Sequence, residues 1–220
     1  MNTKTAKQKI LDAAAILFYN DGITSTGINS ITDKAKVAKM SLYNNFPTKA
    51  DLITSYIEAR HQEWLDLYAL RNQQAHTPID KIVAVFEAYQ DHAEFAYEKG
   101  FRGCGLLNAA AEFPAHSAER LAVKAHKDEI ENIISTQLAY IISDADKVKQ
   151  MALLLSFILE GSIARAGLES SSEKVQAATA MVKTLLAQEI NTWISLFLRY
   201  QIMVLLQCCS LLFYGERRAQ

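Results

Sequence analysis

Lysines concentrate at the start of this chain, where they could bind a polyanion. Residues 1–50 carry seven lysines against three aspartates, a net charge of +4, whereas the remainder of the chain carries −5. A basic end on an acidic body predicts that only the first segment meets a polyanion such as nucleic acid. Chance clustering of lysines is the alternative if charge alone is considered.

Residue types that support catalysis or metal binding do not fall into any productive spacing. There is no pairing of a nucleophile with a base, no phosphate-binding loop, and no His or Cys spacing typical of metal ligands. Three cysteines (Cys104, Cys208 and Cys209) make no disulfide framework, and no signal peptide opens the chain, which predicts the reducing cytoplasm. Cys104 is either a reactive thiol or an inert loop residue; we expect the inert one, because Arg102 is the nearest cation in the sequence. The sequence therefore predicts no catalytic residue, metal or cofactor, although a small helical enzyme remains an alternative.

Three short helices are predicted before residue 50. The first ends at Gly22, the second follows a turn over residues 24–27, and the third covers about residues 39–46, where Pro47 ends it. Apolar residues at helical spacing define the first two helices: Ile10, Leu11, Ala14, Leu17, Phe18, Ile28, Ile31 and Ala35. Since only a tight turn separates the last two helices, the pattern predicts a helix-turn-helix.

The rest of the chain predicts an all-α helical bundle, because only 3 prolines and 8 glycines interrupt its 220 residues. Thr48 can cap a helix over about 49–73. Further helices are predicted over 78–100, 106–113, 117–143, from Asp144 or Asp146 through Ile163, and over about 173–190. We expect a DNA-binding domain over 1–47, a ligand-binding and dimerisation domain over 48–190, and an apolar extension over 191–220.

Two stretches of the first fifty-five residues resemble the TetR family of bacterial helix-turn-helix regulators. The first is ILDAA at residues 10–14, followed by Leu17, Phe18 and Gly22, and the second is SLYNNFPTKADLI at residues 41–53. Lys36 stands in the helix-turn-helix turn where the family usually has glycine, so a positive φ there would carry a modest strain. Met40 stands where the family often has a smaller residue, which affects the expected operator sequence.

The resemblance implies a recognition helix that enters the major groove, with its N-terminal residues facing base edges. Lys39 is expected to read guanine, and Met40 to contact a thymine methyl group. Asn44 is expected to read adenine or to bind a phosphate.

Other residues of this stretch are expected to bind phosphates, which position the protein without reading sequence. They are Ser41, Tyr43, Asn45 and Lys49, with Tyr43 and Lys49 favoured by the resemblance. A packing role for Tyr43 is the alternative, since exposed tyrosines often cover apolar neighbours. Leu42 and Phe46 are expected in the core.

One such domain reads only a few base pairs, so a palindromic operator and a homodimer are expected. The two apolar helices after Asp146 are the predicted dimer surface, and Gly161, Ala164 and Gly167 would let a partner helix approach closely. Alternatively, both apolar faces are used inside the monomer. By resemblance, the regulator is expected to repress transcription and to be released by a small molecule.

Aromatic and polar side chains of the second domain are candidates for an effector site. The candidates are Trp64, Phe86, Tyr89, Phe95, Phe101, Asn108, Glu112, Phe157, Glu160 and Arg165. Aromatic residues on helices more often form plain core, and the polar ones could instead pair with one another or face solvent.

Residues 193–214 form an apolar run long enough to cross a bilayer. Three interpretations remain open: an extra helix packed on the body or across a dimer, a membrane anchor, or a poorly ordered extension. A membrane-attached regulator is therefore an alternative function.

Overall fold

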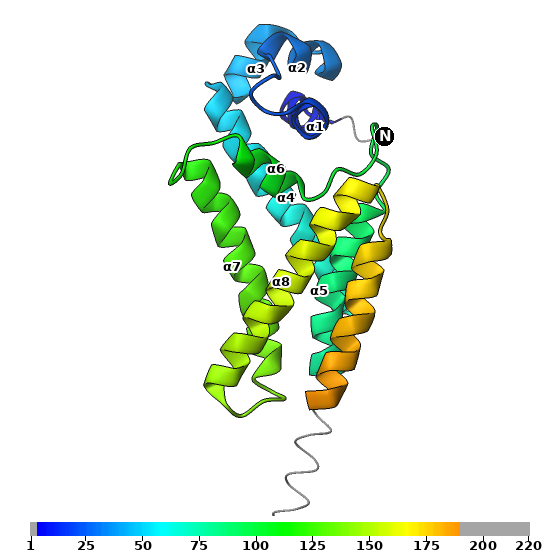
Figure 1. The fold of residues 1–220 in the computed structure, drawn as a ribbon. Coiled ribbons are helices and arrows are strands. Elements are labelled where there is room, and N and C mark those ends of the chain that lie inside the picture. The colour runs from blue at the N-terminus through cyan, green and yellow to red at the C-terminus, as the bar shows by residue number, and fades with distance from the viewer. Residues whose placement is uncertain (1–3, 190–220) are drawn as a thin grey trace, which may run out of the picture. The chain divides into compact units, whose positions relative to one another are not determined.

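The computed structural model describes residues 4–189, and all regular secondary structure in that range is helical (Figure 1). The chain divides into two compact units, Met1–Thr179 and Ala180–Gln220. The predicted apolar extension over 191–220 lies outside the described residues. The observed helices of the first unit are α1 (Ala6–Asp21), α2 (Ile28–Ala35), α3 (Lys39–Asn45), α4 (Lys49–Asn72), α5 (Pro78–Ala93), α6 (Gly105–Ala111), α7 (Ala118–Leu138) and α8 (Ala145–Glu169). A further helical stretch covers 173–189.

The first three helices form the predicted helix-turn-helix. Gly22 ends α1 at a φ of 90°, a conformation that glycine adopts without strain. Lys36 ends α2 in the left-handed region at a φ of 54°, so this chain places a lysine in the conformation that usually favours glycine. The core of the domain consists of residues that are almost fully buried: Ile10, Phe18, Ile31, Leu42 and Phe46.

Helix α4 connects this domain to the helical body (Figure 1). Thr48 caps α4 as predicted, and its hydroxyl accepts a hydrogen bond from the backbone N–H of Asp51. The Asp51 carboxylate accepts in return from the Thr48 backbone N–H at 2.9 Å, which completes a capping box. The first turns of α4 bury Leu52 and Ile53, while its later turns pack against α5 and α7. One rigid element therefore belongs to both parts of the first unit.

Two predicted helices end well before the residue that the sequence pattern gives. Helix α5 ends at Ala93 instead of residue 100, and α7 ends at Leu138 instead of residue 143. The segment 94–104 leaves the helix because its side chains bind the helix-turn-helix domain, as when Tyr97 stacks on Tyr19 with ring centroids 4.4 Å apart. Local helical spacing contains no information about such a distant contact.

Helix α8 buries one face and exposes another. The buried side packs on α5 and α7, and the exposed side carries Leu153, Leu154, Phe157, Gly161 and Leu168. Within residues 4–189, α8 is the helix that is long and apolar enough to cross a membrane. The core helix of a soluble protein passes the same test, so this finding is only weak evidence for a membrane span.

The expectation that Gly167 is open to a partner helix is wrong. A Cβ added at Gly167 would lie 2.4 Å from the backbone nitrogen of Gly103, so this glycine allows a close backbone contact within the chain. Gly161 has no heavy atom within 4 Å of such a Cβ and remains open.

Candidate functional site

Helix α3 presents an exposed surface to solvent while its apolar side is buried. Met40 and Tyr43 have 71% and 41% of their surface exposed, and Lys39 and Asn44 are also exposed. Leu42 is fully buried, as predicted. A 71% exposed methionine beside a lysine and an asparagine forms a surface that suits base edges, because it combines apolar contact with hydrogen-bonding groups.

Two of the residues predicted to bind phosphate make bonds inside the domain. Asn45 is half-buried, and its side-chain amide donates to the Ser41 carbonyl at 2.8 Å. The Lys49 ammonium donates to the carbonyl of Ile23 at 2.6 Å, in the turn between α1 and α2. Lys49 therefore fixes the start of α4 against that turn. Ser41 is also half-buried, so the exposed surface of α3 is narrower than the sequence predicts.

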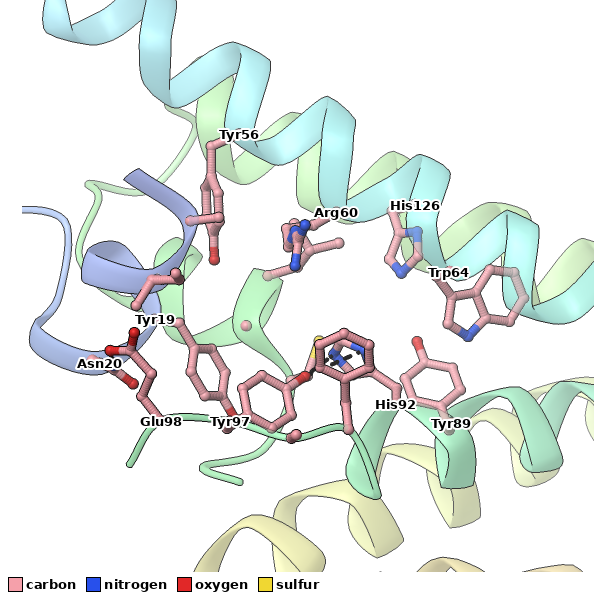
Figure 2. Close-up of a pocket in the computed structure, with 17 residues that line it drawn as sticks. Tyr19, Asn20, Tyr56, Arg60, Trp64, Tyr89, His92, Tyr97, Glu98 and His126 are labelled. Carbon is pink, nitrogen blue, oxygen red and sulfur yellow. Dashed lines mark hydrogen bonds between the residues drawn. The ribbon is translucent and has the colours of Figure 1, made fainter. Parts of the chain in front are cut away.

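A cavity of about 330 Å³ lies between α1, α4, α5 and α7 (Figure 2). Tyr56, Arg60 and Trp64 lie along α4 at intervals of four residues, and they face Tyr89 and His92 on α5 (Figure 2). The lining residues are Ala15, Ile16, Tyr19, Asn20, Tyr56, Arg60, Trp64, Tyr89, His92, Phe95, Ala96, Tyr97, Glu98, Cys104, Gly105, Leu106 and His126. Four of them belong to α1, so the DNA-binding domain forms one wall of the cavity.

Of the residues proposed from sequence as effector contacts, Trp64, Tyr89 and Phe95 line this cavity. Phe86 and Phe101 are buried core residues outside the lining, and Phe157 is 64% exposed on α8. The polar candidates bind elsewhere: Asn108 donates to the Arg102 carbonyl, Glu112 accepts from backbone N–H groups of the α1–α2 turn, Glu160 pairs with Lys127, and Arg165 pairs with Glu169.

Sequence reasoning missed several lining side chains: Tyr19, Tyr56, Arg60, His92, Tyr97 and His126. The spacing of four between Tyr56, Arg60 and Trp64 was a signal that these residues share one face of a helix. No comparable signal existed for Tyr19, because it belongs to the DNA-binding domain.

Arg60 brings a positive charge to the cavity wall. Its guanidinium Nη1 lies 2.6 Å from the Glu63 carboxylate, and burial raises the pKa of Glu63 while the arginine only partly offsets this. The Arg60 Nε–H and the Trp64 indole N–H are both buried without a hydrogen-bond acceptor. Buried donors without acceptors are uncommon in proteins, so these two point to a group that the cavity receives.

Both lining histidines are neutral at ordinary pH. Burial lowers the pKa of His92 to about 4, and the positive charges of Arg60 and Lys127 act in the same direction. Burial likewise lowers the pKa of His126 to about 3. His126 lies with its Nδ1 2.8 Å from that of His61, and His92 contacts the Tyr97 hydroxyl. The cavity therefore has polar edges without gaining charge from its imidazoles.

Cys104 has a cationic neighbour that the sequence did not reveal. The Lys127 ammonium lies 3.6 Å from its sulfur and 2.8 Å from the Glu160 carboxylate. Burial lowers the pKa of Lys127, yet Cys104, Tyr89 and Glu160 together raise it above its usual value. Arg102 is the nearest cation in the sequence, but the fold also brings Lys127 of α7 to the thiol.

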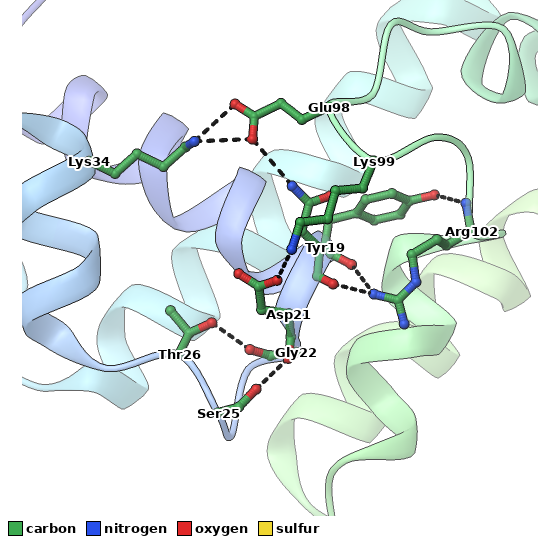
Figure 3. A network of polar contacts seen from close by, with 10 residues as sticks. Tyr19, Asp21, Gly22, Ser25, Thr26, Lys34, Glu98, Lys99 and Arg102 are labelled. Atoms are coloured by element: carbon green, nitrogen blue, oxygen red, sulfur yellow. Dashed lines mark hydrogen bonds and ion pairs between the residues drawn. The ribbon is translucent and has the colours of Figure 1, made fainter.

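A network of polar contacts connects the segment 94–104 with the helix-turn-helix domain (Figure 3). Glu98 accepts from the Lys34 ammonium of α2 at 2.9 Å, and Lys99 pairs with Asp21 at the end of α1. The Arg102 guanidinium donates to the α1 carbonyls of Tyr19 and Asn20 at 2.9 and 2.6 Å. Residues of the same segment line the cavity, so the segment contacts both the cavity and the DNA-binding domain.

Glu112 forms a second connection at the end of α6. Its carboxylate accepts from the backbone N–H groups of Ile23 and Thr24 at 2.8 and 2.7 Å. Partial burial would raise the pKa of Glu112, but these hydrogen bonds outweigh it and lower the pKa below its usual value. The α1–α2 turn is thus held by α6 as well as by Lys49.

A helix-turn-helix with an exposed recognition helix, joined to a helical body with which it shares a cavity, is typical of the class of helical DNA-binding regulators. Comparison with known proteins agrees. Residues 10–56 match the profile described as bacterial regulatory proteins, tetR family. No curated protein sequence matches the chain.

Solved structures match most of the chain. SCO4454, a TetR-family transcriptional regulator from Streptomyces coelicolor, is 26% identical with a TM-score of 0.75, covering 84% of this chain and 96% of its own. A TetR transcriptional regulator from Legionella pneumophila is 19% identical with a TM-score of 0.71, covering 84% and 99%. The reduced form of NemR from E. coli is 20% identical with a TM-score of 0.65, covering 82% and 96%. The first domain of this protein thus matches the TetR-family model, and the fold of the chain is the one seen in solved TetR-family transcriptional regulators.

Proposed function

We propose that this regulator binds a palindromic operator as a homodimer, represses transcription, and releases the DNA when a small molecule fills the cavity. The observation that carries the proposal is the shared wall: Ala15, Ile16, Tyr19 and Asn20 of α1 line the cavity and belong to the helix-turn-helix domain. A molecule in the cavity would touch the DNA-binding domain directly. The proposal implies a cytoplasmic protein with no catalytic step, since its target is bacterial DNA.

On the DNA side, we assign base reading to the exposed N-terminal part of α3. Lys39 and Asn44 offer hydrogen-bonding groups to base edges, and Met40 offers apolar contact to a thymine methyl group. Tyr43 and Ser41 would bind phosphates. Lys49 and Asn45 would contribute by holding α3 and α4 in place, in addition to any phosphate contact.

Release requires that the ligand bind more tightly to a conformer that cannot span both half-sites. The segment 94–104 and Tyr19 are placed for this role, because each contacts the cavity and the DNA-binding domain. A ligand that moves Tyr97 would disturb its stacking on Tyr19, and a shift of Glu98 would change its pairing with Lys34.

The test is binding of purified protein to DNA fragments that flank its own gene, at several salt concentrations. The variant combines Tyr43→Ala with Asn44→Ala, two exposed changes on α3. The control is Lys124→Ala, an exposed side chain on α7. We expect salt-sensitive, sequence-selective binding by the wild type and by the control. The double variant should bind at least about tenfold more weakly, because it loses the base contact of Asn44, worth ~1–3 kcal/mol, and the phosphate contact of Tyr43.

Equal binding of all three proteins to any DNA sequence would contradict the assignment of α3. If no fragment binds, a genome-wide selection for bound DNA replaces the flanking fragments. A selection that also returns no preferred sequence would overturn the proposed function.

A further inference from the structure

The cavity lining is rich in aromatic rings. Eight of its seventeen residues carry an aromatic ring: Tyr19, Tyr56, Trp64, Tyr89, His92, Phe95, Tyr97 and His126. Around Trp64 the rings are set at different angles, with Tyr89 tilted by 48° and His126 by 84°, each with centroids 5.6 Å apart. Such walls suit a flat, apolar ligand body, which can meet one ring face to face and another edge on.

The volume limits the size of that body. At about 330 Å³ the cavity is near the lower end of the range of ~300–1,000 Å³ that is typical of ligand sites. A compound of one or two fused rings with one substituent is therefore a better match than a large or flexible molecule.

The sign of the charge on the wall distinguishes between ligand types. Among the cavity-lining residues Arg60 carries the positive charge, since His92 and His126 are neutral at pH 7. Glu98 is the lining carboxylate, but the Lys34 ammonium already pairs with it at 2.9 Å. An organic cation would gain from the rings, yet the like charge of the Arg60 guanidinium would repel it.

Hydrogen-bond donors without acceptors also favour an anionic ligand over a cationic one. The Glu63 carboxylate pairs with Nη1 of the Arg60 guanidinium, while the Arg60 Nε–H has no acceptor. The Trp64 indole N–H, one turn further along α4, has none either. A ligand that supplies acceptor oxygens would satisfy these two buried donors.

We propose that the effector is a compact aromatic carboxylate, with its rings between the aromatic walls and its anionic oxygens at Arg60. This inference deepens the proposed function and rests on it only for the release of DNA. Binding in the cavity can be measured without DNA, so a failure of the proposed ligand class can be distinguished from a failure of the proposed release of DNA.

Calorimetric titration with three probes of matched shape tests the chemical class. The probes are 2-naphthoate, 2-naphthylmethanol and 2-naphthylmethylammonium, which share one ring system and differ in charge. We expect the wild-type protein to bind the carboxylate at least about tenfold more tightly than the ammonium compound, because a charge-assisted bond to guanidinium is the stronger type.

Three variants locate the anion. Arg60→Met should weaken carboxylate binding by about tenfold and leave the alcohol nearly unchanged, since only the anion uses the guanidinium. Glu63→Gln should tighten carboxylate binding, because it removes the competing anion; a merely structural role for Arg60 would not produce this gain. Arg165→Met, on the exposed part of α8, should change nothing.

A preference for the ammonium probe, equal affinity for all three, or no heat from any of them would overturn the inference. The same holds if Glu63→Gln weakens the carboxylate. If the carboxylate binds as expected but leaves operator binding unchanged, the ligand class stands and the proposed release mechanism fails.

Discussion

Some side chains of the DNA-binding domain also make contacts that serve another part of the molecule. Tyr19 lies on α1 of the DNA-binding domain, but its ring lines the cavity and its hydroxyl donates to the Gly103 carbonyl at 3.1 Å. Burial raises the pKa of Tyr19 to about 12, so the hydroxyl stays protonated and keeps donating. Lys49 was predicted as a phosphate ligand from sequence, and its bond to Ile23 gives it a structural role that sequence could not reveal.

Glycine at position 167 is required by the backbone contact with Gly103. Gly167→Ala would place a methyl group against backbone atoms at 2.4–2.7 Å, which no side-chain rotation can relieve. We expect the free energy of unfolding to fall by about 1–3 kcal/mol, the usual cost of overpacking. Equilibrium unfolding in urea measures this.

Gly161→Ala is the matched control, because a methyl group there meets no atom of the chain within 4 Å. Its stability should stay the same or rise by up to ~1 kcal/mol, since alanine favours helix. Equal losses for both variants would contradict the assigned contact at Gly103.

At the scale of elements, helix identity could be predicted from sequence better than helix ends. The helix-turn-helix, the Thr48 cap and the start of α8 at Asp144 follow from local residue types. The end of α5 does not, because residues 94–99 contain no glycine or proline to stop a helix. Their contacts with residues nearly eighty positions away on α1 hold them out of the helix. The cavity was only partly predictable for the same reason, since one wall comes from the other domain.

The segment 94–104 should transmit ligand binding to the DNA-binding domain. Lys99→Met combined with Arg102→Met removes its bonds to Asp21, Tyr19 and Asn20, and neither residue lines the cavity. We expect the effect of saturating 2-naphthoate on operator affinity to shrink several-fold, because the coupling free energy depends on contacts that change between the two states. Operator titrations with and without the probe measure this.

Stability serves as the check on that variant. The exposed Lys99–Asp21 ion pair contributes ~0–1 kcal/mol. The hydrogen bonds from Arg102 to the α1 carbonyls contribute more, so the double variant should remain folded with a somewhat lower unfolding midpoint. An unchanged ligand effect in a folded variant would assign the coupling to α4 or to Glu112 instead.

At the scale of the whole molecule, the exposed apolar face of α8 needs an explanation. Leu154, Phe157, Gly161 and Leu168 follow one another at intervals of three, four and seven residues, so together with the adjacent Leu153 they share one side of the helix. Leu168 is 83% exposed and Phe157 is 64% exposed. Contiguous exposed apolar surface is typical of interaction sites. Under the proposed function the partner on this face is a second copy of the chain, because a palindromic operator has two half-sites.

Charges introduced on this face should therefore separate the dimer. Phe157→Lys combined with Leu168→Lys would place two desolvated ammonium groups of each subunit in the interface, whereas Leu121→Lys changes a 53% exposed leucine on α7 and serves as the control. By sedimentation equilibrium, the wild type and the control should have twice the 24.6 kDa mass of the chain, and the double variant the single mass. Binding to the full palindrome should drop to the affinity for one half-site in the double variant alone, because the two recognition helices would no longer be linked. A double variant that still sediments as a dimer would show that the subunits meet elsewhere, and the α8 face would then need another partner.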